Sequence, residues 1–235
     1  MPTEKSGTGK NLVIGMGQIG SAIREILQCE GHDPARNICA PLMEYDTLHI
    51  CFPYSSMFSR EVERYRDFFK ARLVIVHSTV PVGTCDKLYA VHSPVRGIHP
   101  NLVQGIRTFV KYFGGINSGE AAQIFEDVGI RTKVAILAKD TEAMKLWDTT
   151  QYGLNIILEK AIAEYCKNHN LDFDLVYTDA NRTYNEGYEA LGHPEYKKYV
   201  LRHVDGKIGG HCVMPNLDLL SGDVADFIRK KNASL

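Results

Sequence analysis

The chain has 235 residues, of which 44% are hydrophobic and 23% are charged, and its formal net charge at pH 7 is −1. These values are typical of a folded globular protein and exclude a disordered chain. They also exclude a nucleic-acid binder that depends on bulk positive charge. With roughly 150 residues per domain, the length indicates one large domain or one and a half.

The sequence predicts a cytoplasmic protein without a membrane or nucleic-acid partner. No apolar run approaches the roughly 20 residues that a membrane span needs, and Met1–Lys10 lacks the apolar core of a signal peptide. The six cysteines form no CxxC pair, which favours free thiols in a reducing compartment. Cys166 and His169 are spaced as C-x-x-H, but two ligands do not make a metal site, so no metal is expected.

A glycine-rich loop follows the first apolar segment. Asn11–Ile14 reads as a strand, the GxGxxG pattern comes directly after it, and residues of helical character continue to Glu30. In this setting the first glycine allows a tight turn, the second lets a pyrophosphate approach the main chain, and the third lets the helix pack against the strand. The loop predicts a site for NAD, with NADP left open. The cofactor-binding residues expected there are Gly15, Met16, Gly17, Gln18, Ile19 and Gly20.

The segment after this helix departs from the usual pattern. An acidic residue that binds the ribose is expected about 20 residues after the loop, at the end of a second strand. The two prolines in residues 31–41 argue against a central strand, Asp33 comes too early, and Glu44 falls after the break. Arg36 could meet a 2′-phosphate, although a surface arginine is the preferred interpretation. We therefore expect a shortened second βα unit and assign no ribose-binding acid.

Strands and helices then alternate, which predicts an α/β fold of the Rossmann type with a doubly wound, mostly parallel sheet. Ligands are expected at the carboxyl ends of the strands, where Gly15, Pro53, Ser78 and Ser93 lie. The expected strands and strand-like segments are Thr47–Phe52, Leu73–His77, Tyr89–His92, Arg107–Phe113 and Lys133–Leu137. The expected helices are Met57–Lys70, one after Gly83, and Gly119–Val128.

From Asp140 the hydrophobic period becomes helical, and one long helix is predicted to run to about His169. We expect a Rossmann domain over residues 1–139 and a helical segment over residues 140–235, with shorter helices at 174–185, 195–203 and after Ser221. The predicted buried side of the long helix comprises Ala143, Trp147, Leu154, Ile157, Leu158, Ala161, Ile162 and Tyr165. The second side, which spacing alone assigns to solvent, carries Glu142, Lys145, Asp148, Thr149, Tyr152 and Asn155.

Several segments, in this order, resemble the nucleotide-sugar 6-dehydrogenases, the UDP-glucose/GDP-mannose dehydrogenase family. The glycine loop is followed by Ser78-Thr-Val-Pro-Val-Gly-Thr84, by Glu142-Ala-Met-Lys145 with its helix to Asn155, and by Gly209-Gly-His-Cys212. His92-Ser-Pro-Val-Arg96 and Gly114-Gly115 also match. The Gly-Gly-His-Cys loop is most similar to the branch that oxidises UDP-N-acetylhexosamines.

The resemblance implies an NAD-dependent oxidation in two hydride steps, in which a cysteine forms a thioester that water hydrolyses. Cys212 corresponds to that thiol, Lys145 to the lysine that positions the substrate oxygen, and Thr79 to a threonine near the reacting water. The implied catalytic residues are Cys212, Lys145, Thr79, Thr149 and Asn216. The implied substrate-binding residues are Arg96, Glu142, Lys145, Asn155, Gly209 and Gly210, and Pro53, Ser78 and Thr79 join the cofactor site. A homodimer through the long helix is also implied. Without the motifs, Cys212 would be interpreted as a small buried residue and Lys145 as a surface lysine.

Three positions depart from the family pattern. The family's catalytic glutamate is Val95 here, its asparagine one turn after the lysine is Thr149, and its aspartate after the cysteine is Asn216. The family's C-terminal domain, which covers the nucleotide of the sugar, does not follow the cysteine loop. Because valine cannot transfer a proton, three hypotheses remain open. They are an oxidoreductase with a Cys212 nucleophile, a binding protein without turnover, and a single-hydride dehydrogenase that uses Lys145 as acid/base.

Overall fold

The computed structural model describes residues 9–41, 43–97, 100–210 and 212–235. The chain separates into two compact units, Met1–Lys145 and Leu146–Leu235. We call them unit 1 and unit 2 and describe each by itself. The boundary falls inside the long helix α6 (Ala138–His169), which therefore belongs to both units.

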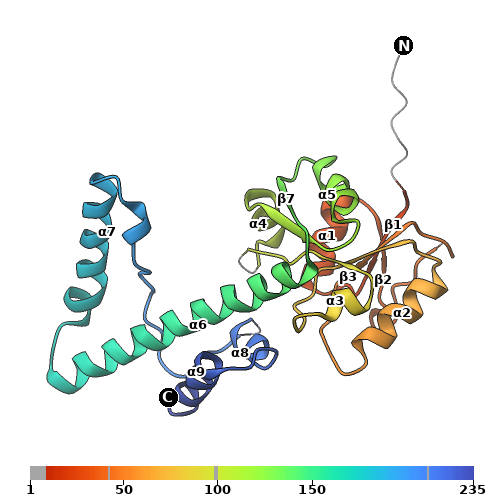
Figure 1. The fold of residues 1–235 in the computed structure, drawn as a ribbon. Coiled ribbons are helices and arrows are strands. Elements are labelled where there is room, and N and C mark those ends of the chain that lie inside the picture. Colours follow the sequence, from red (N-terminus) through yellow and green to blue (C-terminus); the bar gives the residue numbers. More distant parts are fainter. Residues whose placement is uncertain (1–8, 42, 98–99, 211) are drawn as a thin grey trace. The chain divides into compact units, whose positions relative to one another are not determined.

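Unit 1 is built on a β-sheet flanked by helices (Figure 1). In its described residues the sheet has seven strands in the order β2-β1-β3-β4-β5-β6-β7. The strands are β1 (Asn11–Ile14), β2 (Glu30–His32), β3 (Thr47–Ile50), β4 (Leu73–Val76), β5 (Val91–His92), β6 (Lys111–Gly114) and β7 (Thr132–Ala135). Neighbouring strands are parallel except β5 and β6, which pair antiparallel at His92 and Gly114. The predicted mostly parallel, doubly wound sheet is confirmed.

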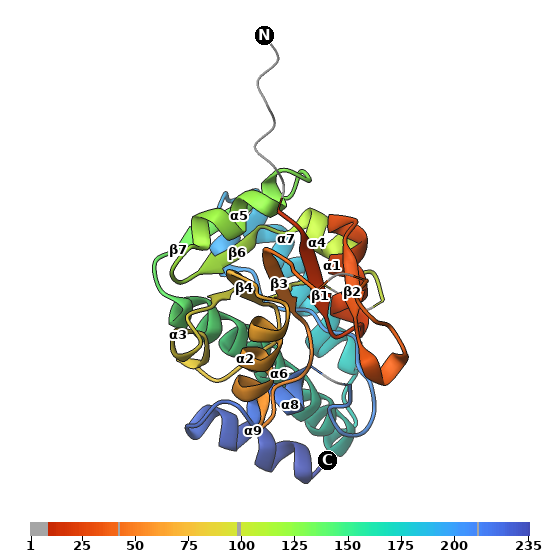
Figure 2. The same cartoon turned by 90° about the vertical axis from the view of Figure 1, so that its right-hand side faces the viewer.

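Helices cover both faces of this sheet, as the turned view in Figure 2 shows. One face packs against α1 (Gln18–Leu27), α4 (Leu102–Thr108) and α5 (Ser118–Glu126). The other face packs against α2 (Phe58–Phe68), α3 (Thr84–Lys87) and Ala138 at the start of α6. All four residues of β3 and of β4 are buried, as expected for central strands covered on both sides.

Three expectations for unit 1 are corrected. Helix α1 ends at Leu27 rather than Glu30, because Gln28 adopts a left-handed conformation with φ 48°. Glu30 then opens the short strand β2, which ends before the first proline, so the prolines do not prevent a strand at the sheet edge. The segment Arg107–Phe113 is split between the end of α4, which was not predicted, and β6.

Unit 2 continues α6 and adds a π-helical segment (Asp174–Asp179), α7 (Ala180–Ala190), a 3₁₀ turn (Pro194–Tyr196), α8 (Val213–Leu217) and α9 (Asp223–Ala233). Its apolar core joins Ile157 of α6 to residues of α8 and α9. A β-carbon on Gly153 would lie 2.7 Å from Cγ1 of Val213, so this glycine lets α8 approach α6 closely.

The predicted helix over 195–203 is wrong. Only the 3₁₀ turn forms, and Lys197 is extended with ψ 139°. The physical reason lies in Asn185, whose side-chain amide pairs with both backbone groups of Lys198. Its Nδ2 donates to the Lys198 carbonyl at 2.9 Å, and its Oδ1 accepts the Lys198 N–H at 2.8 Å. The backbone groups that a helix would need are therefore already used.

The predicted sides of α6 are also partly wrong. Ile157 is buried, but Trp147, Leu154, Leu158 and Tyr165 are exposed, with 38–56% of each residue accessible. On the side assigned to solvent, Glu142 and Thr149 are buried. The helix turns a largely polar stripe inward and leaves an apolar stripe outside. We call Trp147, Leu154, Leu158 and Tyr165 the apolar stripe of α6.

Two further observations concern the chain as a whole. Among the described residues, no helix is both long and apolar enough to span a membrane. All six cysteines are free thiols, and Cys212 is exposed rather than buried.

Candidate cofactor and substrate site

The glycine loop has the geometry that a bound pyrophosphate requires. Gly15 has φ 89°, a conformation that side chains disfavour, and a β-carbon on Gly20 would lie 1.9 Å from the Gly15 carbonyl oxygen. In contrast, a β-carbon on Gly17 would meet no described atom within 4 Å, so the main chain is open to a ligand there. Gly17 is the N-cap of α1, and the first turn of this helix carries no acidic residue. The positive end of the helix dipole therefore faces this opening.

Asp33 lies at the carboxyl end of β2, beside the glycine loop. Its Oδ2 accepts the backbone N–H of Met16 at 2.8 Å and lies 3.6 Å from Nε of Arg36. The side chain of Asp33 is 17% exposed, so it is held in place and still accessible. This is the place in a Rossmann fold where an acid binds the ribose, and sequence spacing missed it because β2 has only three residues. The sequence feature that indicates the role of Asp33 is its place directly before Pro34, where a short strand must end.

The turns after β3 and β4 lie together at the same edge of the sheet. Oγ of Ser78 donates to the carbonyl of Phe52 at 2.6 Å, which ties the two turns to each other. Pro53 is exposed and Thr79 is half-buried on these turns. The structure therefore brings Pro53, Ser78 and Thr79 to the carboxyl edge that also carries the glycine loop, as parallel pairing of β1, β3 and β4 requires.

Glu142 is fully buried, and its carboxylate binds main-chain amides. Its Oε2 accepts the N–H of Gly83 at 2.5 Å, and its Oε1 accepts the N–H of Cys85 at 2.8 Å. These amides belong to the N-terminus of α3, so the carboxylate caps that helix and anchors the Ser78–Thr84 segment to α6. The geometry gives Glu142 a structural contact in unit 1, whereas the resemblance implied a contact with substrate.

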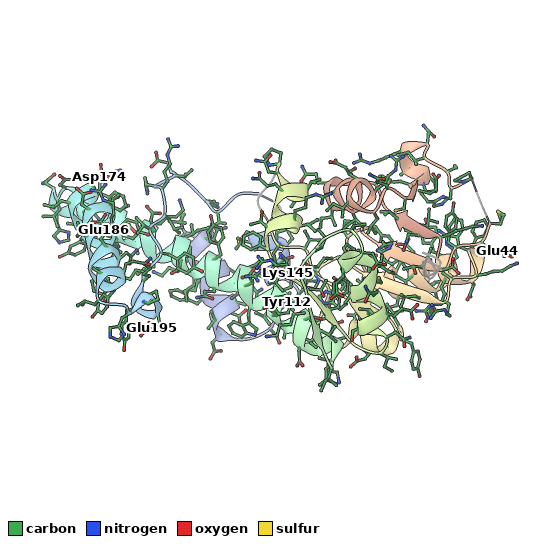
Figure 3. The ribbon with its side chains drawn as sticks, turned by 90° about the horizontal axis from the view of Figure 1, so that it is seen from above. Glu44, Tyr112, Lys145, Asp174, Glu186 and Glu195 are labelled. Carbon is green, nitrogen blue, oxygen red and sulfur yellow. The ribbon has the colours of Figure 1, made fainter. Side chains whose placement is uncertain are left out.

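Lys145 and Val95 meet at the site. The Lys145 ammonium donates to the main-chain oxygen of Val95 at 3.0 Å, and Figure 3 labels Lys145 on α6. Arg96, the next residue, places its guanidinium over the ring of Phe109 at 5.6 Å from the centroid. A small, partly open pocket lies here, lined by Pro94, Val95, Arg96, Ile106, Phe109, Val110 and Lys111.

The buried side chain of His92 on β5 lies between the turn after β4 and the start of α6. Its Nδ1 lies 2.9 Å from Oγ1 of Thr141, and its Nε2 lies 3.3 Å from the Ser78 carbonyl oxygen. Burial lowers the pKa of His92 to about 3, so the ring is neutral at physiological pH. The neighbouring Ser93 Oγ is buried without a hydrogen-bond partner in the part of the chain that the structure describes.

The other predicted site residues lie in unit 2. Nδ2 of Asn216 donates to Oγ1 of Thr149 at 3.3 Å, and both residues are buried, so the structure brings these two positions together. Asn155 donates to the Gln151 carbonyl of its own helix. Cys212 is the N-cap of α8 and is exposed, as are Gly209 and Gly210. Cys212 and Lys145 thus belong to different units, and His211, which precedes the cysteine, lies outside the described residues.

The parallel sheet, the glycine loop and the helix that starts on it define a Rossmann-type dinucleotide fold. No model of a protein family matches the chain. Its sequence is similar to the UDP-N-acetyl-D-mannosamine dehydrogenase of Methanocaldococcus jannaschii, at 24% identity over 66% of this chain. The match covers 36% of that relative, so the chain spans little more than a third of its length.

Solved structures show the same fold. A UDP-D-ManNAc dehydrogenase from Pyrococcus horikoshii has a TM-score of 0.72 and 18% identity, over 95% of this chain and 68% of that one. A UDP-glucose dehydrogenase from Pyrobaculum islandicum has a TM-score of 0.72 and 13% identity, over 100% and 70%. The 3-hydroxyisobutyrate dehydrogenase of Mycobacterium tuberculosis has a TM-score of 0.66 and 16% identity, over 97% and 94%. The resemblance to nucleotide-sugar dehydrogenases is confirmed as a similarity of sequence and fold.

Proposed function

We propose that the chain is an oxidoreductase that uses a nicotinamide dinucleotide. The observation that carries the proposal is the open main chain at Gly17, set at the N-terminus of α1 with Asp33 beside it. A pyrophosphate fits the backbone amides of the loop, and the carboxylate of Asp33 would accept hydrogen bonds from the ribose hydroxyls. Because a carboxylate repels a 2′-phosphate, we expect NAD to bind more tightly than NADP.

The substrate side of the proposal rests on the residues around Lys145. The bound nicotinamide would supply hydride exchange, and Lys145 would hold the substrate oxygen and move its proton. A single-hydride reaction needs no residue beyond these. Val95 and Asn216 support this simpler reaction, because neither side chain can act as the acid or base that the two-step oxidation uses.

The two-step reaction remains the leading proposal for Cys212. Its thiolate would add to the aldehyde carbon, the adduct would give a second hydride to a second oxidised dinucleotide and become a thioester, and water would release the acid and restore the thiol. The exposed place of Cys212 at the N-terminus of a helix turn suits a nucleophile better than a core residue. The similarity to UDP-sugar dehydrogenases supports a nucleotide sugar as the substrate.

The cofactor is tested by thermal unfolding with NAD, NADH, NADP and NADPH in turn, since a bound ligand raises the unfolding temperature by mass action. We expect a shift with NAD or NADH that is lost in Gly17→Ala, because the added methyl fills the space above the main chain without touching the fold. Gly119→Ala, at another open glycine position, is the matched control and should keep the shift. The absence of a shift with every dinucleotide would refute the oxidoreductase proposal.

The reaction is tested by turnover of UDP-sugars. We expect Lys145→Met to abolish turnover and Cys212→Ala to stop the reaction at the aldehyde. If Cys212→Ala turns over like the wild type, the thioester reaction is excluded and the single-hydride reaction stands. If dinucleotides bind and no substrate is converted by any form, the protein binds the cofactor without turnover.

We also propose that two copies associate through α6. The apolar stripe of α6 is exposed in the single chain and gives a second copy a surface to cover.

We further propose that the protein works in the cytoplasm. The six free thiols support a reducing environment of this kind.

A further inference from the structure

A line of polar groups crosses an apolar face of the sheet in unit 1. Nε2 of His49 on β3 lies 3.0 Å from Oδ1 of Asn11 on β1, and Nδ1 of His49 lies 3.1 Å from Nε2 of His77, which follows β4. Nδ1 of His77 lies 3.2 Å from Nζ of Lys111 on β6. The two histidines and Lys111 are buried, and the ring of Phe125 on α5 packs against all three. We call His49, His77 and Lys111 the buried array.

The array ends under the segment that holds Lys145. Nζ of Lys111 donates to the carbonyl of Ser93 at 3.1 Å and approaches that of Pro94 at 3.5 Å, while Lys145 donates to the carbonyl of Val95 at 3.0 Å. Three successive carbonyls are therefore bound by two lysines. β6 makes this possible because it runs antiparallel to β5, so its first residue lies at the carboxyl edge of β5.

The acceptors at the two ends of the array decide where its protons lie. Nδ2 of Asn11 donates to the Gly9 carbonyl, so its Oδ1 faces His49 and requires a proton on Nε2 of that ring. Neutral His49 then accepts at Nδ1, which requires the proton of His77 on Nε2. Nδ1 of His77 is left without a proton, only 2.8 Å from the Ser93 carbonyl oxygen. These two acceptors need a hydrogen-bond donor within reach of both, and Nζ of Lys111 is that donor.

The titratable groups that face Lys111 come from several elements of unit 1. His49 faces it from β3, Cys51 from just after β3, His77 from just after β4, His92 from β5, and Lys145 from α6. Burial, with a smaller contribution from Lys145, lowers the pKa of Lys111 to about 7. Burial lowers the pKa of His49 to about 3 and that of His77 well below its usual range. Below about pH 7 the positive charge of the array therefore resides on Lys111.

We propose that Lys111 is a positioning residue for the reaction at Lys145: it fixes the tautomers of His77 and His49 and orients the Ser93 and Pro94 carbonyls, next to the Val95 carbonyl that Lys145 binds. The part of this proposal that concerns a reaction at Lys145 rests on the proposed function.

The first test needs no activity and uses the whole chain with ¹⁵N-labelled histidine. Long-range ¹H–¹⁵N spectra of the wild type should show His49 and His77 neutral and protonated at Nε2. In Lys111→Met the donor to Nδ1 of His77 is lost, and the ring should change to the Nδ1–H form that faces Ser93. A wild-type His77 protonated at Nδ1 would overturn the proposal, and this result does not depend on whether the variant folds.

The second test applies the same spectra to Lys133→Met, which removes an exposed lysine on β7 and is the matched control. Both histidines should keep the wild-type tautomers in this variant. A change of the His77 tautomer in Lys133→Met as well as in Lys111→Met would overturn the assignment to Lys111.

If the chain turns over a substrate, we expect Lys111→Met to lower kcat with little change in KM, and Lys133→Met to change neither. A fall in kcat that only matches the loss of folded protein would assign Lys111 a purely structural role.

Discussion

A β-carbon on Gly20 would overlap the Gly15 carbonyl oxygen, whereas a β-carbon on Gly119 would meet no described atom within 4 Å. Both glycines lie in helices, so alanine suits the backbone at either one. We expect Gly20→Ala to lower the free energy of unfolding by about 2–3 kcal/mol, since the loop must shift to admit the methyl. Gly119→Ala should raise it by about 0.5–1 kcal/mol through helix propensity. Urea unfolding measures both, and equal effects would contradict the close packing of α1 on β1.

Neutral buried histidines make the stability of unit 1 depend on pH. The pKa of His49 and of His92 is lowered to about 3 in the folded chain, against an ordinary value near 6.5. Between these values the unfolded chain binds the proton and the folded chain does not. Stability is therefore full above pH 6.5 and falls as the pH drops towards 3, by about 1.4 kcal/mol per unit for each histidine.

The check is a series of urea unfolding curves between pH 7 and pH 5 for the wild type, His49→Gln and His169→Gln. We expect His49→Gln to be less stable at pH 7 but to lose less stability on acidification. His169 is exposed at the end of α6, so its replacement should leave the slope unchanged. An identical slope in all three proteins would show that His49 is protonated to the same extent in the folded and unfolded chains.

At the scale of elements, α6 presents the clearest prediction. Its apolar stripe repeats along one side of the helix, over Trp147, Leu154, Leu158 and Tyr165. We expect the wild type to have the mass of two chains in light scattering and Leu158→Glu to have the mass of one, because a carboxylate in a buried apolar interface is costly. Lys167→Glu, at an exposed position of α6 outside the stripe, should keep the wild-type mass.

Elements with a strong local pattern were predictable from the sequence. β3 and β4 are short apolar runs, and the glycine loop follows β1 at once. The sides of α6 were not predictable, because hydrophobicity alone assigns Leu158 to a core while Gly153 decides which side α8 approaches. The strand β2 was missed because Glu30-Gly31-His32 has no apolar run and is recognised only by its pairing with β1.

For the molecule as a whole, the sequence motifs indicated the edge of the sheet at which Gly17, Ser78 and Lys145 are found. They did not reveal Asp33, whose role depends on where β2 ends. They also did not reveal Lys111 and His49, because polar residues in a strand normally indicate a solvent-facing side. Only their mutual hydrogen bonds make their burial tolerable, and such long-range pairs leave no trace in local spacing.

The strand order of unit 1 follows the order of the chain closely, since only β2 is placed out of turn. Each new strand therefore pairs with one already present, and no strand has to wait for a distant partner. The last strand, β7, ends at Ala135, before α6 begins. During synthesis the whole sheet of unit 1 can therefore leave the ribosome and form before the last helices of unit 2 have been made.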